Sequence, residues 1–156
     1  MKQKMTACEI IQETYDYYIK NPNERRALDG NEDTCVYNLQ VNSDYKNDKH
    51  CAVGRCLRLK YHRQREDLTG NNESVETLID AQCEYDYPDG VFTIDSMLKK
   101  KYRGHPEGFW EALQNFHDNG IFWCSSSNSI TKDGQGRYEI LMRNYKKGGR
   151  EYHGTV

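Results

Sequence analysis

Apolar residues recur with a helical period at the start of the chain. The stretch TACEIIQETYDYYIK at 6–20 opens with a capping box, in which Thr6 accepts a backbone N–H one turn in and Glu9 reaches back. Apolar side chains then fall three and four residues apart until Asn21 and Pro22 interrupt the pattern, because the residue before proline is pushed out of the helical conformation. We therefore predict a first helix that ends near residue 20.

Three later stretches have the same periodicity and predict helices at 74–82, 106–118 and 137–147. The stretch VFTIDSMLKKKYRG at 91–104 fits either a short strand or a helix starting at Thr93 or Asp95. Residues 62–74 and 125–135 are rich in Ser, Asn and Gly and predict loops. The sequence leaves open whether these loops become ordered on binding a partner.

The β-structure is limited to the region between the first two helices. TCVYNLQV at 34–41 is rich in β-branched and aromatic residues and predicts a strand. The next apolar stretch, Ala52, Val53, Cys56 and Leu57, fits one face of a helix, or a second strand as far as Cys51 that turns helical afterwards. The pattern as a whole predicts a mainly helical α+β fold, with five or six short helices around a small two-stranded ribbon.

Composition limits the size of the core and the location of the protein. The length of 156 residues predicts a single compact domain over 1–150, followed by a flexible tail at 151–156. Only 36% of residues are hydrophobic, so the core depends on the twelve tyrosines. We find no apolar run of signal-peptide length and none long enough to span a membrane. We therefore expect a cytoplasmic protein with its six cysteines as free thiols.

Cys51 is the first candidate for chemistry. At a helix start the thiolate is stabilised by the positive end of the helix dipole, so Cys51 could act as a nucleophile. His117 would be the base, and Asp118 or Asp95 would orient it. The alternative is that Cys51 packs as a small apolar side chain next to Ala52 and that His117 stabilises a helix end. The aliphatic neighbours favour packing, and the sequence therefore favours a binding protein over an enzyme.

A metal site is the second candidate, with Cys35, His50, Cys51 and Cys56 as its potential ligands. Structural zinc sites favour two to four residues between paired ligands, and no Cys-x2-Cys pair occurs here. The ring and thiol of neighbouring residues such as His50 and Cys51 also converge poorly on one ion. The sequence predicts no metal and no cofactor.

Two clusters of positive charge form the third candidate. They comprise Arg55, Arg58, Arg63 and Arg65 in the first, and Lys99, Lys100, Lys101 and Arg103 in the second. Such clusters bind phosphate or acidic protein surfaces, and nearby tyrosines such as Tyr61 can stack on bases. The net charge of −2 argues against a dedicated nucleic-acid binder. The alternative is a solvated face balanced by the acidic segment at 84–95.

The motif CAVGRCL at 51–57, followed by LQNFHDNGIFW at 113–123, resembles small bacteriophage and prophage proteins with a Cys-Ala-aliphatic-Gly motif and an aromatic helix ending in an Asn/His-Asp pair. The matching residues are Cys51, Ala52, Val53, Gly54, Leu57, Leu113, His117 and Asp118. The chain departs from that pattern at Arg55-Cys56 and in the acidic loop near 84–90. The resemblance implies a phage origin and a mixed helical fold with a small ribbon, but no reaction.

These observations favour an accessory protein that binds and modulates a host or phage protein. Interfaces are enriched in aromatic residues and arginine, and this chain has many tyrosines and arginine clusters. Three alternatives stay open: a nucleic-acid-binding protein using the 55–65 and 99–103 segments, a cysteine-dependent enzyme, and a protein that sequesters a small molecule or nucleotide. The sequence does not indicate an oligomeric state.

Overall fold

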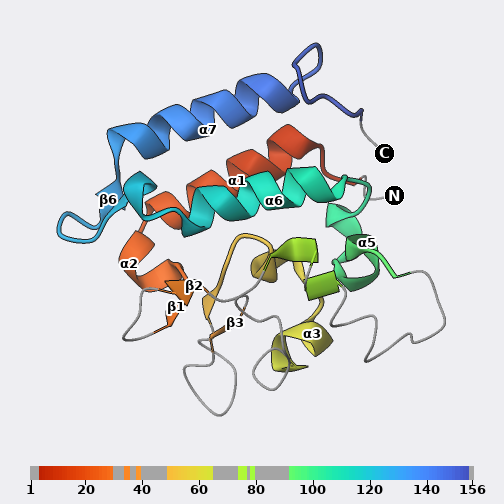
Figure 1. The fold of residues 1–156 in the computed structure, drawn as a ribbon, viewed down its shortest axis with the longest axis horizontal. Coiled ribbons are helices and arrows are strands. Elements are labelled where there is room, and N and C mark those ends of the chain that lie inside the picture. The colour runs from red at the N-terminus through yellow and green to blue at the C-terminus, as the bar shows by residue number, and fades with distance from the viewer. Residues whose placement is uncertain are drawn as a thin grey trace.

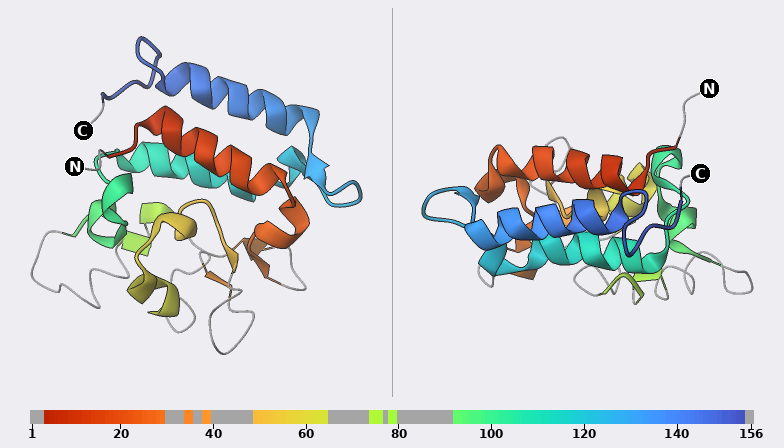
Figure 2. Two further views of the ribbon diagram at one scale, coloured as in Figure 1. Left: turned by 180° about the vertical axis from the view of Figure 1, so that it is seen from behind. Right: turned by 90° about the horizontal axis from the view of Figure 1, so that it is seen from above.

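Three long helices form one side of the molecule in the computed structural model (Figure 1). They are α1 (Ala7–Ile19), α6 (Glu107–Asp118) and α7 (Lys132–Tyr145). Seen from above, α7 lies between α1 and α6 (Figure 2). The structure describes residues 4–29, 34–35, 38–39, 49–64, 74–76, 78–79 and 92–154. Most of the shorter elements lie on the side of α1 and α6 opposite α7, whereas the segment 120–130 lies beside the start of α7 (Figure 1).

Helix α1 begins and ends where the sequence predicts. The Thr6 hydroxyl accepts the Glu9 N–H at 3.1 Å, and the Glu9 carboxylate accepts the Thr6 N–H at 2.8 Å, so the capping box is confirmed. Helix α2 (Pro22–Arg25) starts at the proline that interrupts α1. The buried face of α1 meets α7, where the rings of Tyr15 and Tyr138 stack with centroids 3.8 Å apart.

Helix α7 begins earlier than predicted, and of the predicted loop at 125–135 only residues 125–128 form a turn between two strands. Residues 123–130 form a hairpin of β5 (Trp123–Cys124) and β6 (Ser129–Ile130), and Thr131 caps α7 by accepting the Gly134 N–H at 3.0 Å. A Cβ atom at position 134 would lie 2.3 Å from the Phe122 carbonyl oxygen. Gly134 therefore lets α7 approach the chain that precedes the hairpin, although glycine usually predicts a break in a helix.

The β-structure consists of short antiparallel pairs. β1 (Leu28–Asp29) pairs with β2 (Thr34–Cys35), β3 (Asn38–Leu39) pairs with β4 (Lys49–His50), and β5 pairs with β6. The predicted strand at 34–41 is thus extended at 34–35 and 38–39, and its other residues lie outside the described part of the chain.

The region from 49 to 64 follows the second of the two sequence alternatives. Strand β4 ends at His50, and a 3-10 turn, η1 (Gly54–Cys56), precedes α3 (Leu59–Gln64). An isolated antiparallel bridge then joins Leu57 to Leu98, just beyond α5 (Ile94–Met97). A second 3-10 turn, η2 (Lys100–Tyr102), leads towards α6, and a third, η3 (Gly120–Phe122), follows it.

The core lies between the three-helix layer and these short elements. Trp110, Phe109, Leu113 and Phe116 on α6 are at most 1% exposed, as the predicted stripe requires. Two further sets of buried side chains complete it: Ile10, Ile11 and Tyr18 from α1, and Cys51, Ala52, Val53, Cys56 and Leu57 from the turn region. Val75 and Leu78 are also buried, in agreement with the helix predicted at 74–82.

The mainly helical α+β class is confirmed by this architecture. None of the helices in the described ranges is long and apolar enough to cross a membrane. The described part of the predicted tail contacts the rest of the fold, because the imidazole of His153 lies 2.7 Å from that of His105. The Nε2 atom of His105 in turn bonds to the carbonyl of Met5, so both ends of the described chain meet at one histidine.

Candidate functional site: a core polar cluster and a basic surface

The sequence candidates Cys51, His117 and Asp118 lie in one polar cluster, in which Cys51 and His117 are in the core and the Asp118 side chain is 37% exposed. We define the core polar cluster as Tyr18, Arg26, Cys51, Gln114, His117 and Asp118. Cys51 and His117 have no exposed surface. The Tyr18 ring lies 4.9 Å from the His117 ring, and the Tyr18 hydroxyl donates to the His50 carbonyl at 2.5 Å. The fold therefore brings the three candidates into one region, as the enzyme hypothesis requires.

Both ring nitrogens of His117 form hydrogen bonds within the fold. Its Nε2 accepts the Ala27 backbone N–H at 3.3 Å, so the ring proton resides on Nδ1, which donates to the Asp118 carboxylate at 2.6 Å. Burial lowers the pKa of His117, although Asp118 opposes this effect, and the ring is neutral. Neither nitrogen is available to take a proton from Cys51.

Cys51 is also held in a structural role. Its sulfur accepts the Gly54 N–H at 3.2 Å, and burial raises its pKa well above that of a free thiol. In the described part of the chain no hydrogen bond joins Cys51 to His117. A buried thiol with a raised pKa is a poor nucleophile, so this geometry favours packing.

The remaining members tie three segments to the end of α6. Gln114 accepts the Val53 N–H at 3.1 Å and donates to Asp118 at 2.8 Å. The Arg26 guanidinium donates to the His117 carbonyl at 2.9 Å and lies over the Trp123 ring. Carbonyls at a helix C-terminus lack intrahelical partners, and a cation there is favourable. The cluster thus acts as a junction in the core.

The potential zinc ligands do not converge within the described residues. There, no group of three or more His, Cys, Asp or Glu side chains could hold a metal ion. Cys56 is buried, and burial raises its pKa to about 11. The side chain of Cys35 lies outside the described part of the chain. Asp95, the other proposed orienting acid, instead accepts the Gly104 N–H at 3.1 Å.

The two basic segments meet in the fold. The Arg58 N–H donates to the Met97 carbonyl at 2.9 Å, and the Lys99 N–H donates to the Cys56 carbonyl at 2.9 Å, on either side of the Leu57–Leu98 bridge. We define the basic surface as Arg58, Lys60, Lys99, Lys100, Lys101 and Arg103. The sequence proposes both clusters as one binding surface, and the backbone pairing brings Arg58 and Lys99 together in the fold.

Most of these cations are oriented by uncharged groups. Arg58 donates to the Ser96 carbonyl at 3.1 Å, Lys99 to the Arg55 carbonyl at 3.3 Å, and Arg103 to the Leu98 carbonyl at 3.1 Å. Lys101 lies over the Tyr102 ring, with its Nζ 4.9 Å from the centroid. Within the described ranges, neither Arg58, Lys99 nor Arg103 forms an ion pair with a carboxylate. Carbonyl groups thus orient these three side chains without neutralising their charge.

Arg55 does not belong to this surface. Its side chain is only 14% exposed, and its guanidinium donates to Glu13 at 2.7 Å and to Thr14 at 3.2 Å. Burial alone would raise the pKa of Glu13, but hydrogen bonds from Tyr102 and Arg55 lower it below its usual value. Arg55 thus anchors η1 to α1. The side chain of Arg63, and the whole of Arg65, lie outside the described residues.

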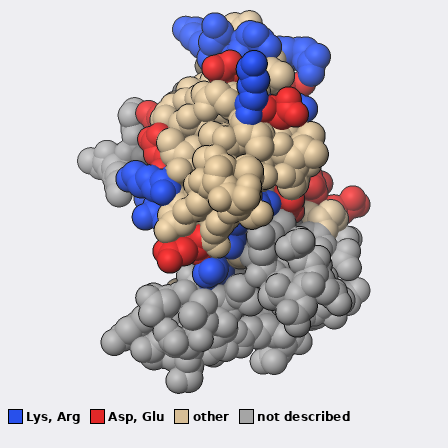
Figure 3. All heavy atoms as spheres, turned by 90° about the vertical axis from the view of Figure 1, so that its left-hand side faces the viewer, with Lys and Arg blue, Asp and Glu red and all other residues tan. Residues whose placement is uncertain are grey.

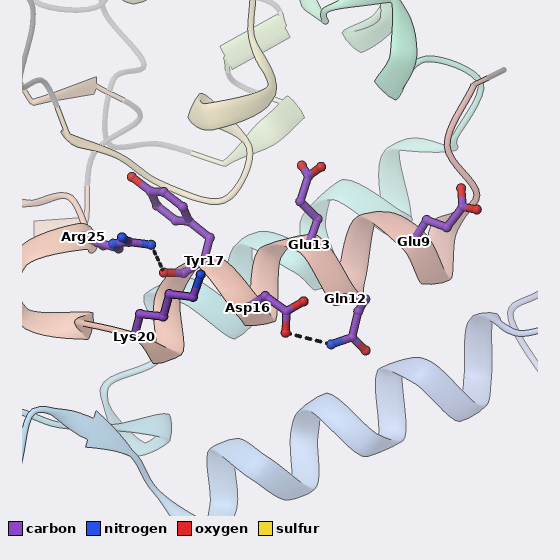
Figure 4. Close-up of a pocket in the computed structure, with 7 residues that line it drawn as sticks. All are labelled: Glu9, Gln12, Glu13, Asp16, Tyr17, Lys20 and Arg25. Atoms are coloured by element: carbon purple, nitrogen blue, oxygen red, sulfur yellow. Dashed lines mark hydrogen bonds between the residues drawn. The ribbon is translucent and has the colours of Figure 1, made fainter. Parts of the chain in front are cut away.

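A groove along α1 presents acidic side chains, but its members bond to one another (Figure 4). Its volume is about 480 Å³, and it is lined by Glu9, Gln12, Glu13, Asp16, Tyr17, Lys20 and Arg25. Asp16 accepts from Gln12 at 2.9 Å, and Arg25 donates to the Tyr17 carbonyl at 2.8 Å. With Glu9 in the capping box and Glu13 paired to Arg55, we assign this groove no ligand.

Sequence reasoning missed Cys124, the thiol whose environment favours reactivity. It lies in the β5–β6 hairpin, and hydrogen bonds from Ser126 and Ser127 lower its pKa to about 7. The serines of SSSNS at 125–129 were a visible signal, but their contact with the thiol depends on the hairpin. A search of protein-family models, curated proteins and solved structures finds no match for this chain.

Proposed function

We propose that this protein is a binding module that contacts an acidic protein through the basic surface. The observation that carries the proposal is the backbone pairing of 56–58 with 97–99, which gathers cations from two distant segments. Charge of one sign gathered locally steers association with an oppositely charged partner. Carbonyls and tyrosine rings hold these cations in place, so binding immobilises fewer free side chains.

Two features support a protein partner over a nucleic acid. Leu59 is 55% exposed between Arg58 and Lys60, and an apolar side chain there suits an acidic segment that also carries apolar residues. Tyr61 and Tyr102 are at most 2% exposed, so their rings are not available to stack on bases. We therefore rank nucleic-acid binding second.

We further propose that the partner is a host or phage protein met in the bacterial cytoplasm. The resemblance of the 51–57 and 113–123 motifs to small phage proteins supports this origin. The resemblance supports the proposed source of the partner, and the basic surface supports its proposed acidic chemistry. The two parts of the proposal are therefore independent.

The test is a set of matched anionic probes. We would measure binding of a peptide of alternating Glu and Leu, a poly-Glu peptide and a DNA duplex over a range of salt concentrations. We expect the Glu-Leu peptide to bind most tightly, and Leu59→Ser to remove its advantage over poly-Glu. The double reversal Arg58→Glu with Lys99→Glu should abolish binding, whereas Lys147→Glu, which follows α7 and is not part of the basic surface, should not.

A pull-down from a bacterial lysate extends the test to natural partners. Proteins that survive nuclease treatment and disappear with the double reversal support the proposal. Preferential binding to DNA with a steep salt dependence would instead establish the nucleic-acid alternative. If the double reversal leaves every recovered partner bound, the basic surface is a solvated face and the proposal is wrong.

A further inference from the structure

A groove between α6 and α7 has no role in the proposed binding function. Its volume is about 480 Å³, within the range of small-molecule sites. Its floor consists of Phe109, Leu141 and Tyr145, which are at most 9% exposed, with Ala112 and Ile140 on the walls. The rings of Phe109 and Tyr145 meet edge to face at 5.2 Å, which fixes the shape of this floor. The groove is therefore apolar at its base.

Gly108 widens this groove without a packing reason inside the fold. It lies in the first turn of α6 and lines the groove, and a Cβ atom there would meet nothing within 4 Å. Gly134 on α7 contrasts with it, because a Cβ atom at 134 would collide with the Phe122 carbonyl. Glycine disfavours a helix by about 1 kcal/mol relative to alanine. The groove is therefore open at Gly108, where any larger side chain would occupy part of it.

Two arginine side chains and one asparagine amide line the rim of the groove. Arg137 and Asn144 come from α7, and Arg150 comes from the turn that follows it. The Arg137 guanidinium carbon lies 5.6 Å from the centroid of the Phe122 ring, a contact that orients the side chain. Figure 3 shows further Lys and Arg side chains gathered at the top of the molecule, where α7 lies. Two cationic side chains, Arg137 and Arg150, therefore line the rim of the groove.

Among the described residues, Glu151 is the one acid that lines the groove. Its carboxylate lies 3.4 Å from Nε of Arg150, and the two side chains are 48% and 80% exposed. An ion pair this exposed contributes little stability, so another carboxylate can replace Glu151 on Arg150 at small cost. The existing pair also demonstrates that a carboxylate reaches Arg150 at the rim.

We propose that the groove between α6 and α7 binds a small organic anion with an apolar body, such as a short-chain carboxylate. The anionic group bonds to Arg137 and Arg150 at the rim, and the Asn144 amide supplies a further donor. The apolar body covers the floor beside Gly108. This site is independent of the basic surface, and its occupancy does not require a protein partner.

The test uses hexanoate as the probe and NMR shift perturbation as the readout, with hexylammonium as the control of opposite charge. We expect hexanoate to shift the signals of groove residues on α6 and α7, and hexylammonium to leave them unchanged. Arg137→Gln should weaken hexanoate binding about tenfold, the effect of losing one charge-assisted hydrogen bond. Arg143→Gln, on the same helix but outside the groove, is the matched control and should bind normally.

A second pair of variants tests the apolar part. Gly108→Leu should fill the groove and abolish hexanoate binding, whereas Gly136→Leu, also at an open position but outside the groove, should not. The reversal of Arg58 and Lys99 should leave hexanoate binding intact, which separates this site from the proposed function. The inference is overturned if hexanoate perturbs no groove signal, if hexylammonium binds equally well, or if Arg143→Gln weakens binding as much as Arg137→Gln.

Discussion

The core polar cluster and the basic surface both bring together residues that are distant in sequence. They differ in the groups that bond to their polar side chains. In the cluster, each nitrogen of His117 bonds to another part of the fold, and Gln114 bonds at both ends of its amide. On the basic surface, Arg58, Lys99 and Arg103 bond to carbonyls, which do not neutralise their charge. A polar group with all its partners inside the fold stabilises it, whereas unneutralised charge at the surface serves recognition. Changes in the cluster should therefore affect stability, and changes in the surface should affect binding.

His117→Leu should have the largest effect on the free energy of unfolding, and it tests whether the core polar cluster stabilises the fold. The change leaves the Ala27 N–H without an acceptor and removes the donor to Asp118, both in or next to the core. We expect the free energy of unfolding to fall by about 2–4 kcal/mol in a urea titration. Asn115→Leu on the exposed face of the same helix is the control and should change it by less than about 0.5 kcal/mol. Equal effects would mean that the cluster contributes nothing specific.

Cys51→Ser should have the next largest effect. A hydroxyl replaces a thiol at a site with no exposed surface, and its burial should cost about 1–3 kcal/mol. Cys51→Ala should cost less because it introduces no polar group. In native protein at neutral pH, iodoacetamide should label Cys124, whose pKa is lowered to about 7, well before Cys51. Rapid labelling of native Cys51 would revive the nucleophile hypothesis.

Stability should also fall on mild acidification. In the unfolded chain His105 and His117 titrate near pH 6.5, and burial lowers the pKa of both in the folded protein. The unfolded chain therefore binds more protons as the pH falls below about 6.5, so the free energy of unfolding is constant above that value and decreases below it. Urea titrations between pH 7 and pH 5 measure this slope, and His117→Leu should reduce it. A stability that rises on acidification would contradict the neutral state of His117.

Arg58→Glu should have the smallest effect on stability, and it tests whether the basic surface serves binding. Arg58 is exposed, and its change should alter the free energy of unfolding by no more than about 0.5 kcal/mol. The same variant should bind the Glu-Leu peptide more weakly, with the loss reduced at high salt. Thermal melts and peptide titrations on one preparation measure both. A large loss of stability would assign Arg58 a structural role like that of Arg55.

Local pattern predicts the elements of this fold well where a capping motif or an apolar stripe is present. The Thr6 capping box and the stripe around Trp110 place α1 and α6 without reference to the rest of the chain. The start of α7 could not be predicted in this way, because Gly134 is explained only by the Phe122 carbonyl that lies against it. A glycine required by a tertiary contact has the same sequence signal as a glycine in a loop.

The sequence predicts many residues of the basic surface, but it does not predict how the fold arranges them. The sequence identified both basic segments, yet their union depends on the Leu57–Leu98 bridge, a non-local pairing with no local signal. It also grouped Arg55 with its exposed neighbours, although Arg55 is buried against Glu13 from α1. Charge is visible in a sequence, whereas burial and pairing partner are set by the fold.

The packing of α1 against α7 has a consequence for the order of folding during synthesis. Tyr15 on α1 donates to Gln135 on α7, 120 residues later. Helix α1 is therefore made well before α7, and the part of its surface that packs on α7 stays uncovered until α7 has been made. Contacts this distant in sequence slow the search for the native state and leave apolar surface open to aggregation in the meantime. The contact between α1 and α7 can thus form only after most of the described chain has been made.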